Sequence, residues 1–163
     1  MTERIQYNPI GVIRSPFDDP DGMPIQPAGD STARGTVELD DEYEAGLADL
    51  DGFSHCILLY HFHAGNDDYS LQPTPFLDDT VRGLFATRAP SRPNQLGLSV
   101  VAVQSVDGAQ ITVSGIDVVD GTPLLDIKPL VGAFDIPSEW TDGWVDDAGA
   151  DVETTAADGR FLE

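Results

Sequence analysis

Apolar and polar residues alternate over several short stretches of the chain, and this alternation predicts β-strands. Successive side chains of a strand point to opposite faces, so a period of two marks a strand with one face on a core. The most apolar stretch, residues 53–63, predicts the central strand. Further strands are predicted at residues 8–17, 34–40, 98–106, 109–119 and 122–131.

Turn signals indicate how these strands connect. Asp107-Gly108 separates two β-rich stretches, and an Asp-Gly pair in that setting is a strong signal for a hairpin. A second pair, Asp120-Gly121, precedes the last predicted strand and needs no role beyond the turn itself. The middle and end of the chain are therefore predicted to be antiparallel.

The pattern changes over residues 40–52, which predict one short helix. Tyr43, Leu47 and Leu50 would share a face of that helix, and Gly52 suits its C-terminal cap. Five to seven strands, this single short helix and long loops together predict a mainly β fold, of the barrel-like type.

The length of 163 residues corresponds to one domain that can bury a substantial core. No internal repeat divides the chain. We assign residues 1–141 to a single β-barrel domain and residues 142–163 to an acidic C-terminal extension that is partly ordered at best.

Charge changes the interpretation of the surface. The chain has 29 acidic residues against 8 Lys and Arg, for a net charge of −21, yet its hydrophobic content of 40% argues against disorder. A folded, acid-coated protein of this kind stays soluble at high salt, which suggests a halophilic source. High salt also screens repulsion from an anionic partner, so a nucleic-acid substrate is not excluded.

Compartment and membrane association follow from what the chain lacks. Cys56 is the single cysteine, so no internal disulfide can form, and the N-terminus has no secretion-signal pattern. The strongly apolar run in residues 53–63 is too short to span a bilayer. We expect a cytoplasmic protein without membrane association.

Three histidines raise the question of a metal site. His61 and His63 would point to one face of a strand, with His55 in phase. At about 3.3 Å per residue, however, His55 would lie roughly 20 Å from His61, so the three cannot share an ion. We expect no metal, with one histidine in the core and another lining a pocket.

The loop at residues 87–97 is the most specific feature of the middle of the chain. No Asp or Glu occurs from Thr80 to Val106, while Pro90 and Pro93 restrict the backbone around Arg88 and Arg92. These arginines could present planar forks to a carboxylate or phosphate. The alternative is a structural loop whose arginines pair with the plentiful carboxylates.

Other catalytic patterns are weak. Ser54 and Ser99 lack the Gly-x-Ser-x-Gly turn of a serine nucleophile, and no glycine-rich dinucleotide or phosphate loop occurs. Lys128 is the only lysine, which suggests that it makes a specific contact.

Six ordered segments resemble the TsaA-like family of S-adenosylmethionine-dependent tRNA methyltransferases. They are "IGVIRSPF", "MPIQP", "GTVEL", "LDGFSHCILLYHFH", "GLFATRAPSRPNQLGLSVV" and "GIDVVDGTPLLDIKP". The resemblance implies a β-barrel homodimer that binds the methyl donor near the subunit boundary. It also implies transfer of the methyl group to the exocyclic N6 of threonylcarbamoyladenosine, next to the tRNA anticodon. The chain departs from the family at Ser91 and Gln95, where relatives commonly have an aromatic residue and a proline.

Site residues follow from the resemblance by matched position. The methyl-donor site would be lined by Pro27, Ala28, Gly29, His63, Ala64, Arg88, Leu98, Ser114, Gly115, Ile116 and Asp117. The acceptor nucleotide would be bound by Arg92, Asn94, Asp126 and Lys128.

The resemblance also suggests roles in catalysis. A modest base suffices for an N–H next to a ureido carbonyl, and His63, His61 or Asp117 could serve. Arg88 or Lys128 could stabilise charge on that carbonyl or bind the threonyl carboxylate. Two alternatives stay open: an S-adenosylmethionine-binding sensor without turnover, and a methyltransferase for a different RNA or a small molecule.

Overall fold

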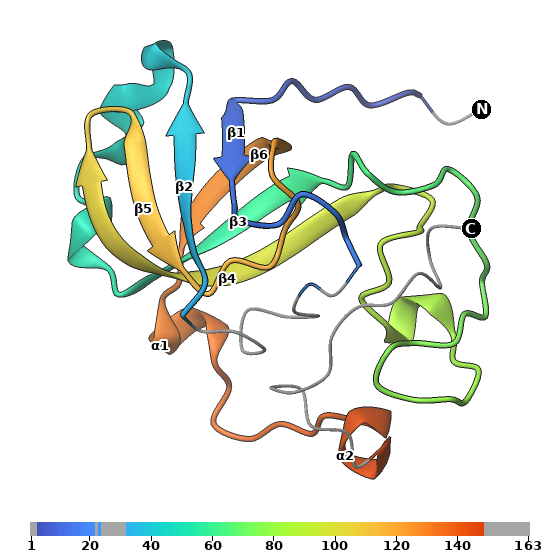
Figure 1. The fold of residues 1–163 in the computed structure, drawn as a ribbon. Coiled ribbons are helices and arrows are strands. Elements are labelled where there is room, and N and C mark those ends of the chain that lie inside the picture. Colours follow the sequence, from blue (N-terminus) through green and yellow to red (C-terminus); the bar gives the residue numbers. More distant parts are fainter. Residues whose placement is uncertain (1–2, 22, 24–31, 149–163) are drawn as a thin grey trace.

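Six antiparallel strands close into a barrel in the computed structural model, which describes residues 3–21, 23 and 32–148 (Figure 1). The order around the barrel is β1-β2-β5-β4-β3-β6, so that β1 pairs with both β2 and β6. Closure leaves no unpaired strand edge. The strands are β1 (Gly11–Arg14), β2 (Arg34–Leu39), β3 (His55–His61), β4 (Leu96–Asp107), β5 (Gln110–Ser114) and β6 (Thr122–Pro129).

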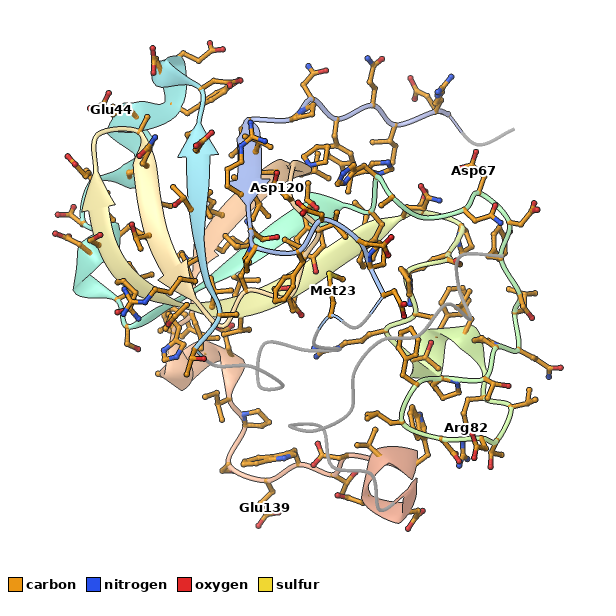
Figure 2. All side chains as sticks on the ribbon, viewed as in Figure 1. Met23, Glu44, Asp67, Arg82, Asp120 and Glu139 are labelled. Carbon is orange, nitrogen blue, oxygen red and sulfur yellow. The ribbon has the colours of Figure 1, made fainter. Side chains whose placement is uncertain are left out.

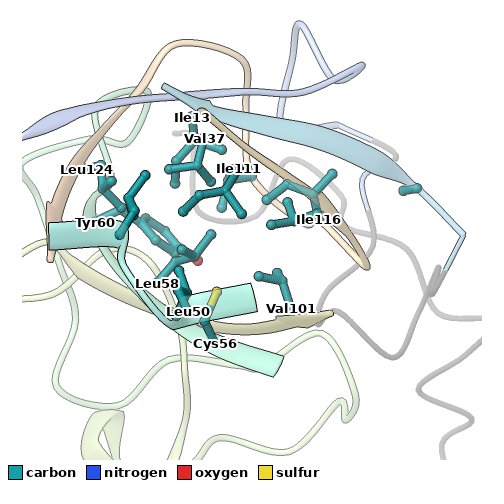
Figure 3. Packing of buried hydrophobic residues seen from close by; sticks show 14 residues of the cluster. Ile13, Val37, Leu50, Cys56, Leu58, Tyr60, Val101, Ile111, Ile116 and Leu124 are labelled. Atoms are coloured by element: carbon teal, nitrogen blue, oxygen red, sulfur yellow. The ribbon is translucent and has the colours of Figure 1, made fainter. Parts of the chain in front are cut away.

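The core fills the inside of this barrel. Burial alternates along β3 and β5, as expected for strands with one face turned inward. Leu58, Val101, Ile111 and Leu124, from four different strands, have no exposed surface, and Figure 3 shows such side chains converging. Their burial removes apolar surface from water, which is the main force that holds the barrel together.

The predicted mainly β barrel is confirmed, while two local elements differ from the expectation. The predicted helix at 40–52 is two 3-10 helices, η2 (Asp41–Leu47) and η3 (Leu50–Gly52), separated at Asp49 with a left-handed φ of 69°. The strand predicted at 109–119 ends at Ser114, because Gly115 takes a φ of 80° and turns the chain. In both places a positive φ interrupts the regular element.

Two long segments outside the barrel form the walls of the site. One connects β3 to β4 and contains the 3-10 helix η4 (Leu84–Ala86). The other follows β6 and contains α1 (Gly132–Asp135) and α2 (Trp144–Ala148). Figure 1 shows the green β3–β4 connection projecting from one side of the barrel, with α2 on that side.

Candidate active site

A cavity of about 880 Å³ lies where the long β3–β4 connection and the C-terminal segment meet the barrel. Its volume is in the range of small-molecule sites. Met23 lies between the barrel and the long connection in Figure 2 and is one of the lining residues. A second hollow of about 550 Å³ lies beside the acidic η2 and contains none of the predicted site residues.

A chain of three buried polar side chains lies at the barrel end of the cavity. With Asp117 ionised, the Ser99 hydroxyl donates to Asp117 Oδ1 at 2.5 Å. The Tyr60 hydroxyl lies 2.8 Å from Ser99 Oγ and donates to it, because the only Ser99 proton is already used. Tyr60 and Asp117 also line the cavity, so these three hydrogen-bonded side chains link the barrel interior to the place where a ligand would bind.

Asp117 is the carboxyl of this cavity that has the burial and the pKa expected of a proton acceptor. Only 8% of its surface is exposed, and burial raises the pKa of its carboxyl to about 7. The Ser99 hydrogen bond and the positive charge of Arg88 oppose that rise in pKa. A carboxyl whose pKa lies near neutrality can accept a proton and release it again at physiological pH. Burial likewise raises the pKa of Tyr60, so its phenol stays protonated.

Close packing fixes Tyr60 in this place. Tyr60 and Gly97 are direct partners in the β3–β4 ladder, and the tyrosine ring lies over the glycine. A Cβ atom at Gly97 would fall 2.1 Å from the Tyr60 ring. A glycine is therefore required on β4, and the ring gains an edge-on contact with Phe62 at a centroid distance of 5.4 Å.

The arginine loop forms another wall, and its two arginines differ. Arg92 Nη1 donates to the carbonyl oxygens of Thr87 and Ala89, at 3.1 and 3.0 Å. It thus holds the loop closed through main-chain acceptors, rather than through the carboxylates considered from the sequence. Arg88 is exposed at the cavity, where its charge acts on Asp117.

The structure brings part of the predicted donor site together. Of the residues predicted to bind the donor, the described cavity lining includes His63, Ala64, Arg88, Leu98 and Asp117.

The remaining predicted donor-binding residues are absent from the described cavity lining or lie outside the described residues. Ser114 closes β5, and the main-chain N–H groups of Gly115 and Ile116 donate to Ala33 O at 2.8 and 3.2 Å. Residues 27–29 lie outside the described residues.

The four predicted acceptor-binding residues do not gather at one place within a single chain. Arg92 lines the cavity, whereas Asn94 is exposed beside it. Asp126 and Lys128 lie on β6 opposite Leu59 and Ile57, and they pair with each other at 2.9 Å. The specific contact expected for Lys128 is thus an ion pair with its neighbour on the same strand.

Ser99, Tyr60 and Trp144 are among the residues of this site that were not predicted from the sequence. Ser99 was considered only as a nucleophile, although a lone hydroxyl in the apolar run of β4 is a signal that it has a buried partner. Tyr60 was taken as part of an apolar strand. Trp144 was placed in an extension without a role, yet it lines the cavity.

Within the part of the chain that the structure describes, no group of three or more His, Cys, Asp or Glu side chains is arranged to hold a metal ion. The helices of the same residues are all too short or too polar to cross a bilayer. Cys56 is buried in the barrel, and burial raises the pKa of its thiol to about 11.

Comparison with known proteins identifies the family. The family model for the tRNA-methyltransferase O N-terminal domain matches residues 12–136. The chain belongs to this family. A crystal structure of TrmO from Pseudomonas aeruginosa superposes with a TM-score of 0.74 at 36% identity, over 90% of this chain and 63% of that one. The resemblance inferred from the six sequence segments is therefore confirmed.

Two relatives show how the match extends. A probable S-adenosyl-L-methionine-binding protein from Pyrococcus abyssi is 43% identical over 158 residues, which is 97% of this chain and 85% of the relative. A tRNA (adenine(37)-N6)-methyltransferase from Mus musculus is 38% identical over 136 residues, covering 79% of this chain and 31% of the mouse protein. The chain thus matches most of the archaeal relative but less than a third of the mouse enzyme.

Proposed function

We propose that this protein is an S-adenosylmethionine-dependent methyltransferase that acts on the exocyclic N6 of threonylcarbamoyladenosine next to the tRNA anticodon. Family membership and the relatives named as tRNA (adenine(37)-N6)-methyltransferases support this function. The single observation that carries it is the cavity in which the buried carboxyl of Asp117, with a pKa of about 7, faces the charge of Arg88.

The chemistry needs a base and little else from the protein. The N6 nitrogen attacks the methyl carbon of the sulfonium, the carbon–sulfur bond breaks, and the N6 proton must leave. Asp117 accepts that proton, and Ser99 stabilises the carboxylate beforehand by donating to its Oδ1. Arg88 stabilises negative charge that develops on the ureido carbonyl. Holding donor and acceptor in line supplies the rest of the rate enhancement.

The methyl donor occupies the cavity in this proposal. Asp117, Arg88, His63, Ala64 and Leu98 contact it directly, since all five line the same space. Residues 114–116 and 27–29 complete the site. The main-chain hydrogen bonds from Gly115 and Ile116 to Ala33 support this arrangement, because Ala33 directly precedes β2 and comes after residues 27–29 in the sequence.

A second copy of the chain belongs to the proposal. Phe134, Ile136 and Trp140 expose 84%, 56% and 65% of their surface along the segment after β6. Exposed apolar side chains of this size along one segment are typical of an interface. In this proposal, Asp126 and Lys128 lie near the acceptor only when two copies of the chain form such a homodimer. Sedimentation at micromolar concentration should give twice the mass of the chain.

The test of the function is methyl transfer itself. Purified protein is incubated with S-adenosylmethionine and tRNA that carries threonylcarbamoyladenosine, and the nucleosides are then analysed by mass spectrometry. We expect a nucleoside heavier by one methyl group, formed at a rate lower by about 100-fold or more with the Asp117→Asn variant. In cells, where we place the enzyme in the cytoplasm with its tRNA, deletion of the gene should remove the same nucleoside.

A sensor that binds S-adenosylmethionine without turnover is the second candidate. The description of the Pyrococcus relative as a binding protein favours it, and neither Asp126 nor Lys128 is among the described residues that line the cavity. Calorimetry that shows donor binding, together with no methylated product under any salt concentration, would select the sensor.

A further inference from the structure

Trp144 opens α2 and lines the cavity from the C-terminal side, together with Asp142 and Val145. Trp144 has no role in the methyl transfer proposed above. The indole is half-buried, so its ring is part cavity wall and part surface. The C-terminal segment therefore supplies an aromatic group to the space in which the barrel supplies Asp117.

Two contacts fix the orientation of the indole. Its Nε1–H donates to the carbonyl oxygen of Ala86 at 2.7 Å, which ties α2 to the end of η4. The guanidinium carbon of Arg82 lies 5.3 Å from the ring centroid, within the range of a cation–π contact. Figure 2 shows Arg82 on the long connection, on the same side of the molecule as α2.

Arg82 is itself held in place. Its Nε donates to Asp78 Oδ2 at 2.9 Å, and its Nη2 bonds to the same oxygen. The main-chain N–H of Arg82 donates to Pro73 O at 2.9 Å. This ion pair lowers the pKa of Asp78, so the carboxylate stays ionised near neutrality. The guanidinium thus has a fixed position against the indole.

The indole offers one side to the cavity. Trp144 is part of the described cavity lining, whereas Arg82, which lies over its ring, is not. The cavity lining also includes two phenylalanines, Phe85 and Phe76. An oriented indole in an apolar wall is a surface on which a nucleobase stacks, and removing such a ring weakens nucleic-acid base binding by about ten-fold or more.

We propose that Trp144 binds an adenine ring in this cavity and that Arg82 and Asp78 are positioning residues that hold the indole for it. The inference rests on the proposed function, because the methyl donor and the acceptor nucleoside are both adenosines. It extends the site to residues that the sequence placed in an acidic tail.

The two tryptophans of the chain make a matched pair for the test. Trp140 is 65% exposed and does not line the described cavity, so Trp140→Phe leaves Trp144 as the sole tryptophan, whose emission is excited selectively over that of the four tyrosines. Trp144→Phe leaves Trp140 instead. S-adenosylhomocysteine should quench the fluorescence of the first variant and leave that of the second unchanged. Quenching by the threonylcarbamoyladenosine nucleoside alone would support the same stacking and assign it to the acceptor.

Affinity gives the second readout. Trp144→Ala should weaken binding of the quenching ligand by about ten-fold, while Trp144→Phe, which keeps an aromatic ring, should recover most of the affinity. Circular dichroism should show that both variants keep the fold. Unchanged affinity in Trp144→Ala, or equal quenching in both single-tryptophan proteins, would overturn the proposal.

Arg82 tests the positioning role. In the Trp140→Phe background, Arg82→Ala should shift the emission of Trp144 and raise KM about three-fold with kcat within two-fold, because stacking contributes to binding rather than chemistry. Arg14→Ala is the matched control, since Arg14 also lies in ion pairs, with Glu38 and Asp120, but on the barrel. An unchanged emission spectrum and KM in Arg82→Ala would remove Arg82 and Asp78 from the proposal.

The parent protein separates this inference from the proposed function. If the parent methylates tRNA while the Trp144 variants bind normally, the inference fails and the function stands. If the parent binds neither S-adenosylhomocysteine nor the nucleoside by calorimetry, the proposed function fails and the inference fails with it.

Discussion

Asp117 and Asp126 lie in one sequence segment, "GIDVVDGTPLLDIKP", yet the barrel gives them opposite environments. Asp117 follows β5 and is 8% exposed, with Ser99 at 2.5 Å and the cavity in front of it. Asp126 lies on β6, where 46% of its side chain is exposed and Lys128 is 2.9 Å away. Nine positions along the chain separate a buried carboxyl from a surface ion pair.

The difference shows that burial, rather than the local sequence, gives a carboxylate its reactivity. A surface ion pair is worth about 0 to 1 kcal/mol, because water and salt already solvate both charges. A buried carboxyl loses that solvation, so its pKa rises until proton exchange near neutrality becomes possible. We therefore propose Asp117, and not Asp126, as the base.

The largest expected effect is on methyl transfer. Asp117→Asn should lower kcat by about 100-fold or more, because a general base contributes about 10² to 10⁴ in rate. Asp126→Asn is the matched control for kcat, which should stay within about three-fold of the parent value, because Asp126 lies in an exposed ion pair and a contact with the acceptor would act on KM. Initial rates with radiolabelled methyl donor measure both. An equal loss of kcat in the two variants would contradict the contrast between Asp117 and Asp126.

The pH dependence of stability should separate the same two residues. The pKa of Asp117 is raised to about 7 in the folded protein, so its stabilising contribution is present below pH 4 and is lost as pH rises through 7. Asp117→Asn has no carboxyl to ionise at this position, so it does not lose stability as pH rises through 7. Its free energy of unfolding should exceed that of the parent by up to about 4 kcal/mol at pH 8 and match it near pH 4.

Urea unfolding at several pH values measures that difference. Asp126→Asn should follow the parent at every pH, because it removes only one exposed ion pair, which is worth about 0 to 1 kcal/mol. If the free energy of unfolding changed with pH in the same way in the parent and in Asp117→Asn, the Asp117 carboxyl would not be desolvated.

The packed cavity end should be far less tolerant of added volume than the exposed loop wall. Gly97→Ala should lower the free energy of unfolding by about 3 kcal/mol, because the new methyl group overlaps the buried Tyr60 ring. Gly83 precedes η4 with no atom within 4 Å of its added Cβ, so Gly83→Ala should change stability by less than about 0.5 kcal/mol. Thermal unfolding of both variants measures the contrast.

The smallest expected effect is a shift in the pH profile. The hydrogen bond from Ser99 lowers the pKa of Asp117, so Ser99→Ala should raise that pKa further. The alkaline rise of kcat, near pH 7 in the parent, should move to higher pH by about one unit, which corresponds to a ten-fold loss of rate below the midpoint. Ser54→Ala, at an exposed serine beside His55, should leave the profile unchanged.

The barrel was predictable because each strand carries its own signal. Alternating burial along β3 and β5 follows from the alternation of the sequence, and the family followed from six segments in a fixed order. The interruptions were less predictable. Asp49 adopts a left-handed φ of 69° that no local preference of aspartate required, so the expected helix became two 3-10 turns.

The donor half of the site was partly predictable, because Arg88 and Asp117 lie within matched motifs and do line the cavity. The rest depends on contacts between distant residues. Tyr60, Ser99 and Asp117 come from β3, β4 and the turn after β5, and nothing in each segment alone indicates the other two.

The sequence by itself determined the strands, the stiff arginine loop and the family, since those depend on local periodicity, backbone restriction and ordered motifs. Only the tertiary structure decided which carboxylate is buried and that Trp144 from the acidic end of the chain faces the same cavity. The physical reason is that desolvation and stacking act through space. Barrel closure and the bond from Trp144 to Ala86 create those surroundings between residues far apart in the chain.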